Sequence, residues 1–164
     1  RITSLGHAIT LLGRRQLMRW LQLLLYSATP GDEHGVSPLL QLAATRGRLM
    51  ELLVDRCPEA PTGGRELIDQ AYLAGILSLM PALLGCPLAL VLAELPVAPA
   101  VQGALDAHAG VLGDLLRLVE ALERDDTEAL AAACARRPEI DAPFANACLS
   151  RALGWANNLA REAQ

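Results

Sequence analysis

Three histidines are the first candidates for acid–base or metal chemistry in this chain of 164 residues. They are His7, His34 and His108, and they lie far apart in the sequence. Zinc-binding helices often carry two histidines at a short interval, as in H-E-x-x-H, and neither that pattern nor H-x-x-x-H occurs here. We therefore interpret each histidine as a surface or capping residue rather than as a metal ligand.

The four cysteines are the next candidates for metal binding. Cys57, Cys86, Cys134 and Cys148 form no C-x-x-C pair, and no histidine lies at ligand spacing from any of them. This pattern disfavours a zinc site and a disulfide scaffold, and it is typical of a protein from a reducing cytoplasm. Cys86, Cys134 and Cys148 lie in apolar stretches, which predicts that they fill space in the core.

Acidic side chains gather near the middle of the second half of the chain. They could surround a divalent ion, but they lack the spacing of an EF-hand loop, so we interpret them as a solvated helix end. The carboxylates concerned are Glu120, Glu123, Asp125, Asp126 and Glu128.

Ser78 and the Gly63-Gly64 pair could serve a nucleophile or a phosphate loop. Ser78 is not part of a G-x-S-x-G sequence, and no Lys-Ser or Lys-Thr follows the glycine pair. We expect the Ser78 hydroxyl to donate to the carbonyl four residues earlier inside a buried helix.

The composition indicates one helical domain over residues 1–164. The chain is 52% hydrophobic and 20% charged, with only five aromatic side chains in total, so the core must consist of aliphatic residues. Its net charge is 14 − 18 = −4, which disfavours nucleic-acid binding. We interpret the basic cluster of Arg14, Arg15 and Arg19 as a solvated helix face.

Nearly every segment has the apolar spacing of a helix, and no alternating run predicts a strand. Arg46, Arg48, Glu51 and Asp55 form the expected polar side of the third helix, which begins at Pro38. Asp141 is the expected cap of the last helix. Helices are predicted over residues 4–12, 14–28, 38–56, 65–80, 87–95, 98–107, 109–124, 127–135 and 143–161.

Residues 71–93 contain no charged side chain and are long enough to span a membrane. Pro81, Gly85 and Pro87 interrupt this stretch, however, and would divide it into shorter helices. The sequence therefore predicts buried helices in a soluble core and no membrane span.

Several segments together resemble one protein family. The most specific are the sequence LGRRQLMRWL at residues 12–21 and GILSLM at residues 75–80. In this order the segments resemble the C-terminal HDOD domain of bacterial EAL–HDOD signalling proteins, and the likeness covers almost the whole chain. The others lie at residues 2–9, 46–52, 71–74, 81–84, 95–96, 113–120 and 152–156.

The resemblance implies a helical bundle of HD/HDOD type whose own N-terminal helices precede Arg1. It also implies an EAL domain further towards the N-terminus, of the kind that binds or hydrolyses cyclic di-GMP. The chain would then be a fragment of a larger protein.

The resemblance also implies where HD-type metal ligands would fall. The His-Asp pair of catalytic relatives corresponds to Ser78 and Leu79, neither of which can hold a catalytic metal. The family's earlier histidine falls near Pro38 or Leu39. Its later His-His pair falls near Ala107 and His108, and its last aspartate falls near Glu123, so His108 and Glu123 are the possible remnants.

We therefore expect a module without catalytic residues, metal or cofactor. It would bind a protein partner or regulate an attached cyclic di-GMP EAL domain. Two alternatives stay open. One is a residual metal-dependent phosphohydrolase that uses His108, Glu123 or the acidic patch with a loosely held ion, and the other is a homodimerisation module that pairs leucine-rich faces.

Overall fold

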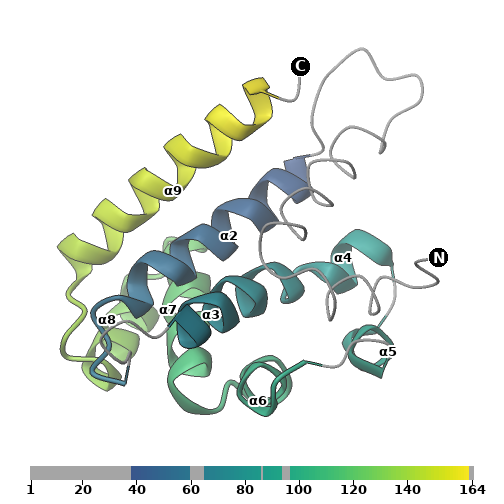
Figure 1. Ribbon diagram of the computed structural model, residues 1–164. Helices are drawn as coiled ribbons and strands as arrows, with labels where there is room; N and C mark the ends of the chain where they lie inside the picture. Colours follow the sequence, from purple (N-terminus) through teal and green to yellow (C-terminus); the bar gives the residue numbers. More distant parts are fainter. Residues whose placement is uncertain (1–37, 60–64, 86, 94–96, 163–164) are drawn as a thin grey trace.

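The computed structural model describes residues 38–59, 65–85, 87–93 and 97–162 (Figure 1). All regular structure within these ranges is helical, which confirms the predicted all-α multi-helix bundle. The predicted helices over residues 4–12 and 14–28 lie outside the described residues. So do the basic cluster, His7, His34, Cys86 and the Gly63-Gly64 pair.

The helix boundaries agree with the predicted ones to within a few residues, with one exception. Pro38 begins the first described helix, and Asp126 and Asp141 accept hydrogen bonds from the first turns of the last two, as expected of helix caps. The helices are α2 (Pro38–Val54), α3 (Arg65–Leu77), α4 (Met80–Leu84), α5 (Leu88–Ala93), α6 (Pro99–Ala107), α7 (Gly110–Glu123), α8 (Thr127–Arg136) and α9 (Ala142–Glu162).

The exception is the uncharged stretch, where the predicted helix over residues 65–80 ends early. α3 ends at Leu77, two residues form a turn, and α4 begins at Met80 with Pro81 in its first turn. Gly85 then ends α4 in the left-handed conformation, with a φ of 65°. Among the described residues, no helix is long and apolar enough to cross a membrane, in agreement with the predicted interruptions.

Helix α2 is the central element of the bundle. It packs against α3, α7 and α9, and α9 runs alongside it (Figure 1). Because neighbours surround α2, Arg46 and Glu51 are buried although the sequence pattern placed them on a polar face. That expectation was wrong for both residues, since helical period alone does not show how many sides of a helix are covered.

Two glycines bring α2 and α3 into close contact. A Cβ atom on Gly75 would lie 2.8 Å from backbone atoms of Arg46 and Gly47, and one on Gly47 would lie 2.8 Å from the Ile76 side chain. The helices can therefore cross at this distance only where both positions lack a side chain. This crossing places Arg46 beside the end of α3.

Candidate functional site

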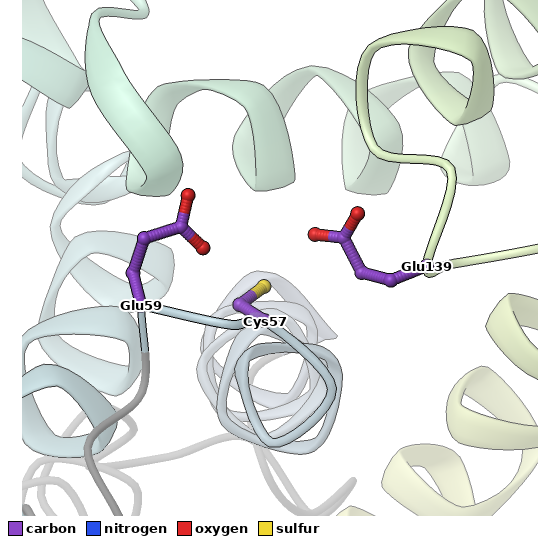
Figure 2. A group of neighbouring side chains, drawn as sticks. All are labelled: Cys57, Glu59 and Glu139. Atoms are coloured by element: carbon purple, nitrogen blue, oxygen red, sulfur yellow. The ribbon is translucent and has the colours of Figure 1, made fainter.

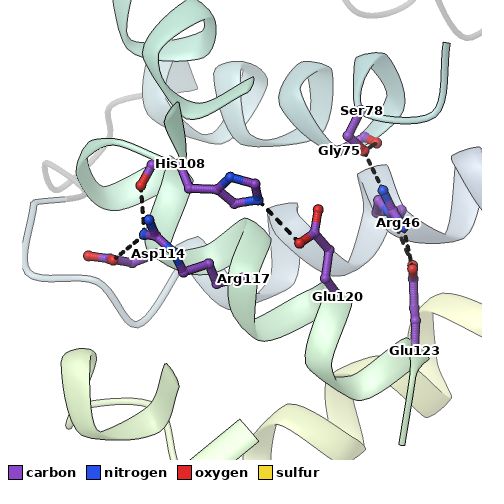
Figure 3. A network of polar contacts seen from close by, with 8 residues as sticks. All are labelled: Arg46, Gly75, Ser78, His108, Asp114, Arg117, Glu120 and Glu123. Atoms are coloured by element: carbon purple, nitrogen blue, oxygen red, sulfur yellow. Dashed lines mark hydrogen bonds and ion pairs between the residues drawn. The ribbon is translucent and has the colours of Figure 1, made fainter. Parts of the chain in front are cut away.

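Arg46 is the centre of a polar cluster that joins three segments (Figure 3). Its Nε donates to Glu123 Oε1 over 2.9 Å, and its Nη2 makes a second hydrogen-bonded ion pair with Glu123 Oε2. Its Nη1 donates to Ser78 Oγ over 2.7 Å. The guanidinium of α2 thus binds the last residue of α7 and the turn between α3 and α4, and Arg46 is only 8% exposed.

The Ser78 hydroxyl has a different role from the predicted one. It lies just beyond the end of α3, is half-buried, and donates to the carbonyl of Gly75 over 2.6 Å. The expected bond to the residue four positions earlier, inside a continuous helix, was therefore wrong. Because the chain turns after Leu77, the hydroxyl reaches the carbonyl three residues back while its lone pairs face Arg46.

The other positions suggested by the family resemblance carry side chains without metal-binding atoms. Leu79 is half-buried and directly precedes α4, while Pro38 and Leu39 begin α2. Ala107 is the last residue of α6. Aliphatic side chains offer no lone pair to a metal ion, so none of these residues can act as a ligand through its side chain.

His108 belongs to a separate polar group that lies along α7. It follows α6 in the left-handed conformation, with a φ of 50°, and its Nε2 lies 3.2 Å from Glu120 Oε2. Its carbonyl accepts a hydrogen bond from Arg117 over 2.7 Å. Gly113 permits this approach, since a Cβ atom there would lie 2.0 Å from the His108 carbonyl carbon.

The two possible remnants are therefore not joined in one site. Glu123 is bound to Arg46, whereas His108 is paired with Glu120 (Figure 3). A catalytic metal centre needs several ligands around one point, and Ser78, Leu79, His108 and Glu123 do not supply that arrangement. The residues at these positions do not fit the metal group of catalytic HD domains.

The acidic residues near the end of α7 also divide into separate groups. Glu120 and Glu123 have the partners described above, and Asp126 Oδ1 accepts the backbone N–H of Ala129 over 2.9 Å as the cap of α8. Asp125 adopts the left-handed conformation in the turn, with a φ of 52°. This agrees with the predicted turn and cap, but the expected solvated helix end was wrong for Glu120 and Glu123, which are half-buried and paired with His108 and Arg46.

A second, partly exposed cluster was not predicted from the sequence. Cys57, Glu59 and Glu139 place one potential ligand atom each within 4.8 Å of one another (Figure 2). Among the described residues, this is the group of three or more histidine, cysteine, aspartate or glutamate side chains whose ligand atoms lie this close together. The spacing of these residues in the sequence does not predict the cluster, because Glu139 lies in the turn between α8 and α9, far from the end of α2.

Arg137 supplies the positive charge of this second cluster. It donates to both carboxylate oxygens of Glu59, over 3.0 and 2.6 Å, and its Nη2 lies 2.5 Å from Glu139 Oε1. The Arg137 hydrogen bond lowers the pKa of Glu59. Burial raises the pKa of the Cys57 thiol to about 11, although Arg137 partly opposes this effect. A metal ion would have to displace the guanidinium and remove a tightly held thiol proton.

Comparisons with known proteins found one informative relative. The chain is 27% identical over 161 residues to the uncharacterized protein YuxH of Bacillus subtilis (strain 168), an alignment that covers 97% of the chain. The same alignment covers 37% of YuxH, so the chain spans well under half the length of this relative. No protein-family model and no solved structure matches the chain.

Proposed function

We propose that this chain is a non-catalytic signal-transduction module, the HDOD-like part of a longer cytoplasmic protein. In this role it binds a protein partner or regulates an attached EAL domain that handles cyclic di-GMP. The proposal rests on the family resemblance and on the chemistry of the two polar clusters.

The observation that carries the proposal is the pairing of Glu123 with Arg46. Under the family resemblance, Glu123 and Ser78 hold two of the positions at which catalytic relatives bind metal. Both side chains instead contact one guanidinium group, and the carboxylate is engaged through both oxygens. A half-buried carboxylate that already has a matched cation on both oxygens has little electrostatic reason to take up a divalent ion.

The size of the relative supports a module within a longer chain. Nearly all of this sequence aligns with a little over a third of YuxH. Such coverage is expected when one domain of a larger protein is compared with the whole.

A residual phosphohydrolase built on the two remnants requires His108 and Glu123 to act on the same ion. Their present partners, Glu120 and Arg46, belong to different polar groups. This arrangement favours the non-catalytic proposal over the hydrolase.

Metal analysis and a phosphodiesterase assay test the non-catalytic part. We expect the purified chain to contain no stoichiometric transition metal, to leave cyclic di-GMP intact, and to keep its Tm when EDTA or Mn²⁺ is added. The matched variants are His108→Ala and Glu123→Ala, with Glu66→Ala as the control because Glu66 is exposed and lies outside the acidic group near the end of α7. Turnover with bound metal that disappears in the first two variants, but not in the control, would overturn the proposal.

A deletion experiment in the longer parent protein tests the regulatory part. Cyclic di-GMP affinity and turnover are measured with and without the segment corresponding to residues 1–164. We expect one of the two quantities to change. Equal values would exclude regulation of an attached domain and leave the protein-partner role. Co-purification of partners with the parent protein and with its deletion variant then tests that role.

A further inference from the structure

The oxygen atoms around Arg46 form a small site made entirely of acceptors. The Ser78 hydroxyl uses its hydrogen in the bond to the Gly75 carbonyl, so only lone pairs remain for Arg46. Both Glu123 oxygens face the same guanidinium. The site therefore offers one negative charge and three acceptor atoms to a cation.

The shape of this site matches a planar, forked cation. The parallel contacts from Nε and Nη2 to the two Glu123 oxygens form the bidentate arrangement that guanidinium and carboxylate groups favour. The third contact, from Nη1 to Ser78, satisfies the opposite edge of the plane. Mg²⁺ and Ca²⁺ prefer six or more oxygen ligands, whereas one carboxylate and one hydroxyl provide three oxygen atoms.

Packed helices hold the backbone that carries these acceptors. Gly75 and Gly47 fix the crossing of α2 and α3, which positions the turn that carries Ser78. Leu116 and Val119 bury α7 in the core, and Glu123 follows one turn later. The acceptors are thus mounted on packed helices, as a preorganised binding site requires.

We propose that Ser78 and Glu123 form a guanidinium-selective cation site that the protein fills with its own Arg46. Shortening Arg46 to alanine empties the site without removing its acceptors. The emptied site then binds a free alkylguanidinium ion from solution and discriminates against divalent metal ions. This inference concerns the site itself and does not depend on the proposed signalling role.

The test is chemical rescue of the Arg46→Ala variant. Its Tm is followed by circular dichroism as methylguanidinium is added in the low millimolar range, below denaturing concentrations. We expect a lower Tm than in the wild type, and a recovery that rises with the logarithm of ligand concentration, as stabilisation by a bound ligand requires. Ammonium and Mg²⁺ salts at equal ionic strength should give no comparable recovery.

Two further variants make the result specific. In Arg46→Ala/Glu123→Gln the carboxylate is lost, so methylguanidinium binding should weaken by about tenfold or more. Arg136→Ala removes an exposed arginine of α8 and should show no ligand-dependent change in Tm. In Arg46→Lys an ammonium group occupies the site without the fork, and the Tm should fall without being rescued.

The proposal fails if methylguanidinium does not stabilise Arg46→Ala, or if Mg²⁺ stabilises it as well as methylguanidinium does. Should Arg46→Ala be unfolded at all temperatures, recovery of helical signal on adding methylguanidinium supports the site, and no recovery refutes it. Either outcome leaves the metal content and the phosphodiesterase assay of the wild type unaffected, so the two proposals can fail separately.

Discussion

Arg46 and Arg137 show how single residues balance charge inside this bundle. Each is about nine-tenths buried, and each binds a carboxylate that lies far away in the sequence. A guanidinium is weakly hydrated and has five donors, so it suits a buried ion pair better than an ammonium group does. Removing either arginine would leave a carboxylate without its matched cation, and breaking an ion pair in this way destabilises the folded protein.

The raised pKa of the Cys57 thiol predicts that the protein loses stability at alkaline pH. Its pKa is raised from 9.0 to about 11 in the folded protein, mainly by burial. The protonated thiol is thus favoured by folding, and its contribution is complete below pH 9.0 and is lost as the pH rises through about 11. A shift of this size corresponds to at most about 2–3 kcal/mol.

Urea unfolding at a series of alkaline pH values measures this effect. We expect the free energy of unfolding to fall less steeply with pH in Cys57→Ala than in the wild type. The comparison uses slopes rather than absolute values, because alanine also leaves a small cavity. Identical slopes would show that another group titrates.

At the scale of the elements, the crossing of α2 and α3 decides the geometry of the Arg46 cluster. Helical period predicts both helices, but it does not predict that Gly47 and Gly75 meet at their crossing point. The turn at Ser78 is likewise set by Pro81, which favours a helix start and allows α4 to begin at Met80. A continuous helix through residue 80 would carry Ser78 in a different direction.

Alanine substitutions at three glycines test the importance of this crossing. Gly47→Ala and Gly75→Ala should each destabilise the protein by about 1–3 kcal/mol, because the new methyl group overlaps backbone or packed side-chain atoms. Gly154→Ala in α9 is the control, since a Cβ atom there meets nothing within 4 Å. It should stabilise the helix by about 0.5–1 kcal/mol.

Thermal and urea unfolding distinguish these outcomes. A crossing that relaxes easily would give all three variants similar stability. A loss of stability confined to the two crossing positions would confirm that close helix contact is required there.

At the scale of the whole molecule, Arg137 joins the two halves of the described bundle. It connects Glu59, just after α2, with the turn before α9, and Glu59 lies 78 residues away in sequence. The neighbouring Arg56–Phe144 contact, with 3.8 Å from the guanidinium carbon to the ring centre, closes the same end of the bundle. This end is therefore held by several contacts between early and late segments.

Adjacent arginines provide a matched test of that connection. Arg137→Met should lower the free energy of unfolding by about 2–3 kcal/mol, somewhat less than for a fully buried pair, because Glu59 is partly exposed. Arg136→Met removes the same charge from an exposed position and should change it by less than about 0.5 kcal/mol. Equal effects in the two variants would mean that the Arg137–Glu59 ion pair adds nothing beyond net charge.

Local features of the sequence predict the helices of this protein and their ends. Apolar spacing predicts helices such as α7 and α9. Pro38 predicts the start of α2, and Asp141 predicts the start of α9. Pro81, Gly85 and Pro87 predict the interruptions in the uncharged stretch. These are local features, so a few neighbouring residues suffice to specify them.

The polar clusters, in contrast, depend on how the helices pack. Arg46 was predicted on the polar side of its helix because its partner Glu123 lies 77 residues away in sequence. The Cys57 cluster was missed because Arg137 lies 78 residues from Glu59. His108 and Glu123 both lie near α7, yet the folded chain gives each a different partner. Which charges meet depends on how packed helices cross, and helical period carries no information about that crossing.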